Sequence, residues 1–95
     1  MPKLNEPEVL GRMAAAKDWE RLGDMLVRSW QFATSRRALE FVGRVVDLAE
    51  LTGHHPDIIL SYRVVRLELS THAHGGLTDQ DFALAAAIDG LPADR

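Results

Sequence analysis

The stretch Glu50-Leu51-Thr52-Gly53-His54-His55-Pro56 connects the longest helical pattern of this 95-residue chain to the strand patterns that follow it. Glycine often ends a helix in a left-handed conformation, and Gly53 is placed for that role. Pro56 has no backbone N–H and biases the preceding His55 towards an extended conformation. The stretch therefore predicts that the long helix stops at about residue 52 and that the chain leaves it extended.

The elements before this stretch follow from the spacing of apolar residues. Apolar side chains recur at helical intervals across residues 35–52 and across residues 6–16, so each range predicts an amphipathic helix. Between them, residues 19–22 and 25–32 are strand candidates, because Gly23-Asp24 is a typical two-residue hairpin turn. This part of the chain therefore predicts a helix, a hairpin and a second helix.

The elements after this stretch are two more strands and a helix. Residues 57–62 and 63–71 are predicted as the strands, and the second alternates apolar and polar side chains. Gly75-Gly76 then marks either a mobile loop or a tight turn. Thr78 and Asp81 have the spacing of a capping box that begins the last helix. The order of elements predicts an α+β fold, a four-stranded antiparallel sheet with helices packed on one face.

The composition fits a single domain over residues 1–95 with an ordinary hydrophobic core. The net charge of −3 and the lack of a basic patch argue against a nucleic-acid partner. The absence of cysteine excludes disulfides, thiolate metal ligands and a cysteine nucleophile. No apolar run approaches the ~20 residues that cross a bilayer, and the first residues lack a signal-peptide core. We therefore expect a cytoplasmic protein with no membrane partner.

All four histidines lie in two short stretches: His54 and His55 follow the long helix, and His72 and His74 follow the predicted strand 63–71. Histidines in loops are most often surface residues, but three imidazoles would converge if this strand ended beside the helix. An imidazole titrates near pH ~6.5, so converging imidazoles suit proton transfer. A metal site is the weaker alternative. Zinc takes three or four ligands and adjacent histidines bind one ion awkwardly, although His72 and His74 could chelate from one strand face.

Polar residues beside the histidines have both structural and functional explanations. Glu50 lies in the last helical turn, where the helix dipole disfavours an acid, so it either orients a histidine or is a solvated surface acid. Asp81 is explained by the capping box, and a direct catalytic role is the less favoured alternative. Ser70 and Thr71 precede His72, and they either hydrogen-bond the polar edge of a ligand or are ordinary strand residues.

The combination of these motifs resembles the pterin-4a-carbinolamine dehydratase family. The resemblance extends from about residue 6 to residue 91. It is carried by a spaced pattern: Glu50-x-x-x-His54-His55-Pro56, Tyr62, Thr71-His72, Gly76-Leu77-Thr78 and Asp81. It implies an α+β fold with helices on one side of the sheet, and assembly as homodimers or as homotetramers built from two dimers. It also implies a lyase that uses no metal or organic cofactor.

The implied reaction is loss of water from 4a-hydroxytetrahydrobiopterin to give quinonoid dihydrobiopterin. This reaction recycles the tetrahydrobiopterin cofactor of aromatic amino-acid hydroxylases, so the resemblance implies a functional link to such a hydroxylase. An alternative is a non-catalytic dimerisation or binding module, either a transcriptional coactivator or an assembly factor. The retained histidines favour the enzyme, because an interaction surface has no need of them.

The resemblance implies that the catalytic residues are His54, His55 and His72. The residues implied to hold the pterin are Glu50, Gly53, Pro56, Ser70, Thr71, Ala73 and Asp81. We hypothesise that His54 and His72 transfer the protons and that His55 binds or assists. The sequence does not decide which histidine is the acid and which is the base. Two positions depart from the family pattern: His74, and Arg63, where an asparagine commonly follows Tyr62.

Overall fold

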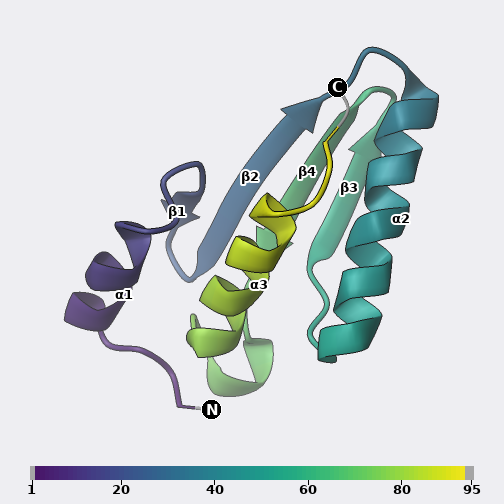
Figure 1. Cartoon of the computed structure of the whole chain (residues 1–95). Helices are drawn as coiled ribbons and strands as arrows, with labels where there is room; N and C mark the ends of the chain where they lie inside the picture. The colour runs from purple at the N-terminus through teal and green to yellow at the C-terminus, as the bar shows by residue number, and fades with distance from the viewer. Residues whose placement is uncertain (1, 94–95) are drawn as a thin grey trace.

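A four-stranded antiparallel sheet forms one layer of the fold, and helices cover one of its faces (Figure 1). The computed structural model describes residues 2–93. In chain order the elements are α1 (Glu6–Met13), β1 (Glu20–Leu22), β2 (Met25–Gln31), α2 (Ser35–Thr52), β3 (Asp57–Ser61), β4 (Val64–Leu69), the 3-10 turn η1 (His72–His74) and α3 (Asp79–Asp89). The strand order is β1-β2-β4-β3. The predicted α+β class and sheet are confirmed.

The core lies between the helices and the sheet face that carries alternate residues of β2 and β4. Trp30 pairs with Val65 across these two strands, and both side chains are buried. Phe41 of α2 packs on Trp30, with 4.8 Å between the ring centroids. Burying a large apolar side chain contributes roughly 1.5–3 kcal/mol, so these contacts fix α2 against the sheet and thereby place its end.

The first helix is shorter than the sequence predicted. It ends at Met13 instead of residue 16, because the N–H groups of Ala15 and Ala16 bond to carbonyls three residues back and form turns. Trp19 belongs to the same run of turns, since its N–H bonds to the carbonyl of Ala16. The first strand therefore begins at Glu20 instead of residue 19.

The hairpin between β3 and β4 takes residues that were predicted to lie in the strands. Tyr62 and Arg63 form its two-residue turn. β3 therefore ends at Ser61, one residue before its predicted end, and β4 begins at Val64, one residue after its predicted start. Tyr62 has a φ of 55°, in the left-handed region that glycine favours, and no glycine marks this turn in the sequence. β2 also ends one residue early, at Gln31.

One end of the molecule brings together the end of α2, the η1 turn and the start of α3 (Figure 1). Gly53 ends α2 as predicted, with a φ of 72° and its N–H bonded to the carbonyl of Ala49. β4 ends at Leu69, two residues before the predicted end, and Thr71 then exchanges backbone hydrogen bonds with Gly76. These bonds close η1, so of the two alternatives at the paired glycines the tight turn is the one observed.

Candidate functional site

The centre of the site is a contact between His54 and Asp81. Their side chains meet at 2.6 Å, from His54 Nε2 to Asp81 Oδ1. The His54 side chain is 14% exposed and that of Asp81 is 0% exposed. Since Gly53 turns the chain out of α2, His54 comes next and lies against the first turn of α3. A buried carboxylate that contacts one ring nitrogen holds the imidazole in one orientation.

Asp81 is held by the capping box that the sequence predicted and by one further contact. Its Oδ2 atom accepts a hydrogen bond from the backbone N–H of Thr78 at 2.9 Å, which completes the box. The hydroxyl of Thr71 donates to the same oxygen at 2.7 Å. Because Thr71 immediately precedes His72, Asp81 links the two histidine stretches. The resemblance implied that Asp81 helps to hold the pterin, and this stays a prediction; the side chain has no exposed surface and contacts His54 through Oδ1.

The second histidine of the first stretch has a different partner. His55 Nε2 lies 3.1 Å from Glu50 Oε2 in the last turn of α2. Both side chains are exposed, at 57% and 70%, so the pair contributes little to stability. The contact is the arrangement expected if Glu50 orients a histidine, the first of the two roles that the sequence left open.

His72 and His74 lie on η1, and both are exposed. A 3-10 turn has about three residues per turn, so side chains two positions apart point in different directions. His72 and His74 therefore do not lie on one strand face, the arrangement in which the sequence left joint metal binding open. Within residues 2–93, no group of three or more His, Asp or Glu side chains is arranged to hold a metal ion.

A cavity of about 230 Å³ opens beside His54. It lies between the end of α2 and the first turns of α3, and its walls are Thr52, His54, Gln80, Ala83 and Leu84. The aliphatic walls suit a flat ring, and the amide of Gln80 can bond to polar ring atoms. The cavity therefore combines a small, partly apolar space with an imidazole backed by a carboxylate.

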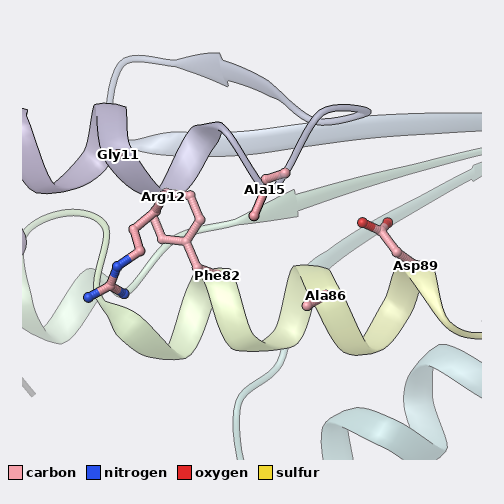
Figure 2. Close-up of a pocket in the computed structure, with 7 residues that line it drawn as sticks. Gly11, Arg12, Ala15, Phe82, Ala86 and Asp89 are labelled. Atoms are coloured by element: carbon pink, nitrogen blue, oxygen red, sulfur yellow. The ribbon is translucent and has the colours of Figure 1, made fainter.

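A second cavity lies between α1 and α3 (Figure 2), and its lining residues include no histidine. It measures about 170 Å³, and Gly11 and Phe82 are among its lining residues. Asp89 at its edge accepts hydrogen bonds from Trp19 Nε1 at 2.8 Å and Arg28 Nη1 at 2.6 Å. A carboxylate committed to these two donors is a structural group, so this cavity is the weaker candidate for acid–base chemistry.

The remaining predicted residues lie on the segments that surround His54 and η1. Pro56 is buried where the chain enters β3, and Gly53 is exposed at the end of α2. Ser70 is half-buried after β4, and Ala73 is exposed on η1. The structure thus brings the predicted residues to one end of the fold, with direct contacts between His54 and Asp81, Thr71 and Asp81, and His55 and Glu50.

Sequence reasoning missed the residues of α3 that line the cavity beside His54. Gln80, Ala83 and Leu84 are spaced i, i+3 and i+4, which puts them on one side of the helix. That spacing was the available signal, but it does not show that this side of α3 lies against the end of α2. The hydroxyl of Thr78 was also missed as a partner of Thr71, 2.9 Å away.

Together, the fold and the site define a small α+β protein with a histidine–carboxylate pair beside a small cavity. The family model for pterin 4 alpha carbinolamine dehydratase matches residues 2–91. The chain therefore belongs to the pterin-4-alpha-carbinolamine dehydratase family.

Relatives named as candidate pterin-4-alpha-carbinolamine dehydratases agree with this assignment. A protein of Chloroflexus aurantiacus is 49% identical over 89 residues, which cover 94% of this chain and 96% of that protein. A protein of Thermomicrobium roseum is 45% identical over 88 residues, which cover 93% of this chain and 95% of that protein.

Two solved structures have similar folds. One, from Brucella melitensis, is described as a transcriptional coactivator/pterin dehydratase; it has a TM-score of 0.85 and 27% identity over 92% of this chain and 95% of that chain. The other is a pterin dehydratase-like protein identified as a RuBisCO assembly factor in the alpha-carboxysome. It has a TM-score of 0.66 and 27% identity over 76% of this chain and 86% of that chain. Proteins with this fold thus include some that are described by roles other than catalysis.

Proposed function

We propose that this protein is a dehydratase that removes water from 4a-hydroxytetrahydrobiopterin to give quinonoid dihydrobiopterin. The observation that carries the proposal is the His54–Asp81 pair at 2.6 Å beside a cavity, in a chain that belongs to this family. The reaction would recycle the cofactor of an aromatic amino-acid hydroxylase without a metal or organic cofactor of its own. A cytoplasmic location is part of the proposal; no helix within residues 2–93 has the length and apolar character to cross a membrane.

The proposed chemistry needs two proton transfers at neighbouring atoms of the pterin. One proton reaches the hydroxyl on the ring carbon, and another leaves the adjacent ring nitrogen, whose electron pair then expels water. His54 and His72 perform these transfers in our assignment, and His55, oriented by Glu50, binds or assists. Carbinolamines lose water readily, so orientation of the substrate and modest acid–base catalysis supply the rate.

The remaining family positions give the pterin its surroundings in this proposal. Ala73 and the half-buried Ser70 flank Thr71 and His72, while Gly53 and Pro56 flank the two adjacent histidines. Their backbone groups are the natural partners for the polar edge of the pterin. Asp81 acts from behind His54.

The proposal is tested by the rate of carbinolamine dehydration, followed by ultraviolet absorbance in a coupled hydroxylase assay. Substituting His54 and His72 together by alanine should reduce the enzymatic rate to that of the uncatalysed reaction, because both proton-transfer groups are lost. His74→Ala is the matched control, since it removes an imidazole from the same turn and should keep the rate. Folding is checked by circular dichroism, and unchanged turnover in the folded double variant would sink the assignment.

A binding module is the second candidate function. Exposed apolar residues that point away from the core favour it, among them Leu39 and Val46 on α2 and Ile59 on β3. β3 is also an edge strand with β4 as its partner in the sheet. These surfaces support assembly as a homodimer or homotetramer, which an enzyme and a binding module would share. A folded wild-type protein without dehydratase activity would favour the binding module.

A further inference from the structure

The hydrogen bonds around Asp81 have a direction that decides which of its atoms can accept another bond. Its side chain is fully buried, and Oδ2 accepts from the Thr71 hydroxyl at 2.7 Å and from the Thr78 backbone N–H at 2.9 Å. A backbone N–H can only donate, so Oδ2 is an acceptor. An aspartate side chain is ordinarily ionised at neutral pH, and an ionised carboxylate has only acceptors. Asp81 therefore accepts through both oxygens.

The two threonine hydroxyls follow the same direction. Thr71 has one hydroxyl hydrogen, which it donates to Asp81, so its oxygen accepts from the Thr78 hydroxyl 2.9 Å away. Thr78 Oγ1 in turn accepts the backbone N–H of Gln80 at 3.2 Å. Each hydrogen in this chain of bonds is directed towards Asp81. Oδ1 is the oxygen that remains for His54, whose Nε2 lies 2.6 Å from it.

We infer that His54 is held as the tautomer with its hydrogen on Nε2, and that Nδ1 is the atom through which it exchanges a proton with the pterin. A carboxylate has no hydrogen to give, so Nε2–H is the donor in the contact with Asp81. The lone pair of the neutral ring is then on Nδ1. When Nδ1 gains a proton the ring becomes an imidazolium beside the carboxylate, and when Nδ1 loses it the same neutral tautomer returns.

The tautomer follows from the hydrogen bonds alone, whereas its catalytic meaning rests on the proposed function. Asp81 and Thr71 are positioning residues in this assignment, because they act through His54. Without them the imidazole could carry its hydrogen on either nitrogen, and a ring with the hydrogen on Nδ1 would present no lone pair to the substrate. The chain of bonds therefore removes the inactive tautomer.

The tautomer can be read from the imidazole ¹⁵N chemical shifts of the ligand-free wild-type protein, at a pH where His54 is neutral. We expect a pyrrole-type shift at Nε2 and a pyridine-type shift at Nδ1, with the signals assigned by their loss in His54→Gln. The opposite tautomer, or an average of the two, would overturn the inference. The measurement does not depend on turnover. An inactive protein with hydrogen on Nε2 would refute the proposed function and leave the tautomer standing.

Asp81→Asn should reverse the tautomer. The position of Oδ2 receives two donors, so the amide oxygen of the asparagine takes it and the amide NH₂ faces His54. The NH₂ donates, which makes Nε2 the acceptor and moves the ring hydrogen to Nδ1. We expect exchanged ¹⁵N shifts and a kcat about 10²–10⁴-fold lower with little change in KM, the usual contribution of general acid–base catalysis.

Asp79→Asn is the matched control for this substitution. Asp79 belongs to the same turn of α3, but its carboxylate pairs with Arg12 on the surface. It should leave both the shifts of His54 and kcat unchanged. Wild-type shifts and kcat in folded Asp81→Asn would overturn the inference. If Asp81→Asn fails to fold, the shifts of the wild-type protein still decide the question.

Discussion

At Asp81, one carboxylate serves both the stability of a helix and the orientation of an imidazole. As the third residue of α3 it completes the capping box with Thr78, a kind of contact that contributes about 1 kcal/mol. Its second oxygen holds His54. Removing the side chain would therefore disturb folding and site together. The substitution Asp81→Asn separates the two effects. The amide oxygen can still accept the hydrogen bond that completes the capping box, whereas the amide NH₂ presents a donor to His54 in place of an acceptor.

Glu6 is the residue at which a pH effect on stability can be assigned. Its carboxylate pairs with Arg21, and the hydrogen bond from that guanidinium holds the pKa of Glu6 below its ordinary value. A lowered pKa in the folded state means that the pair stabilises the fold above the ordinary glutamate pKa of ~4.3, and that this stabilisation is lost as the pH falls through the folded pKa.

Glu6→Gln should therefore lower Tm slightly at about pH 7, and the difference in Tm should shrink as the pH falls through the folded pKa of Glu6, because a protonated glutamate no longer pairs with Arg21. Thermal melts of the two proteins across this pH range measure the difference. The pair is exposed, so added salt should shrink the difference at neutral pH. A Tm difference that stays constant with pH would contradict this account.

At the scale of elements, the helices whose ends carry local signals were predicted most accurately. α2 begins after Thr34 and stops before Gly53, as expected, and α3 follows the Thr78 cap. The hairpin turn at Tyr62 was missed, because a non-glycine residue there is held at positive φ by the pairing of the strands on either side. The residues around Tyr62 carry no turn signal of their own, because the turn is set by the pairing register of β3 with β4.

The site was predicted as a set of residues but not as a set of contacts. The prediction of His54, His55 and His72 as the catalytic residues came from the resemblance to the family and needed only short motifs. The bond from His54 to Asp81 spans 27 positions and depends on how the end of α2 meets the start of α3. Nothing in the capping pattern of Asp81 indicates a second partner. The sequence therefore predicted the helix-capping role of Asp81, whereas its contact with His54 arises from the packing of α3 against the end of α2.

Gly11 offers a test of how α1 is stabilised. It lies inside this short helix, and a Cβ atom added there would meet nothing within 4 Å. Glycine is less favourable than alanine in a helix by about 0.5–1 kcal/mol, so Gly11→Ala should raise the free energy of unfolding by up to that amount. Urea unfolding measures the change.

Gly23→Ala is the control for this prediction, because it also meets open space but has a φ of 61°. The left-handed conformation costs a residue with a Cβ roughly 1–2 kcal/mol, so this variant should be less stable than the wild type. If both alanine variants shifted stability in the same direction, backbone conformation would not be the cause.

At the scale of the whole molecule, the outer side of α2 is suited to pack against a second copy of the chain. Arg36, Leu39, Gly43, Val46 and Glu50 recur at alternating intervals of three and four, the spacing of a helix–helix seam. Leu39 is 50% exposed and Val46 is 40% exposed. A Cβ atom at Gly43 would meet nothing within 4 Å, so nothing in the single chain accounts for a glycine at the middle of the longest helix.

The seam is self-complementary about Gly43. In an antiparallel pair of α2 helices related by a two-fold axis at this glycine, Arg36 of one copy lies near Glu50 of the other, and the backbones can approach closely. Leu39→Glu should therefore shift the protein towards monomers, because it buries a charge in an apolar contact. Light scattering coupled to size-exclusion chromatography measures the mass. Leu10→Glu is the control, since Leu10 is 63% exposed on α1, away from the seam. A wild-type monomer, or equal dissociation by both variants, would show that α2 is not the contact.

If Leu39→Glu alone dissociates the protein, its dehydratase rate then reveals whether the site works within one chain. Glu50, which holds His55, lies at the end of the seam, so loss of activity on dissociation would mean that assembly keeps this pair in place.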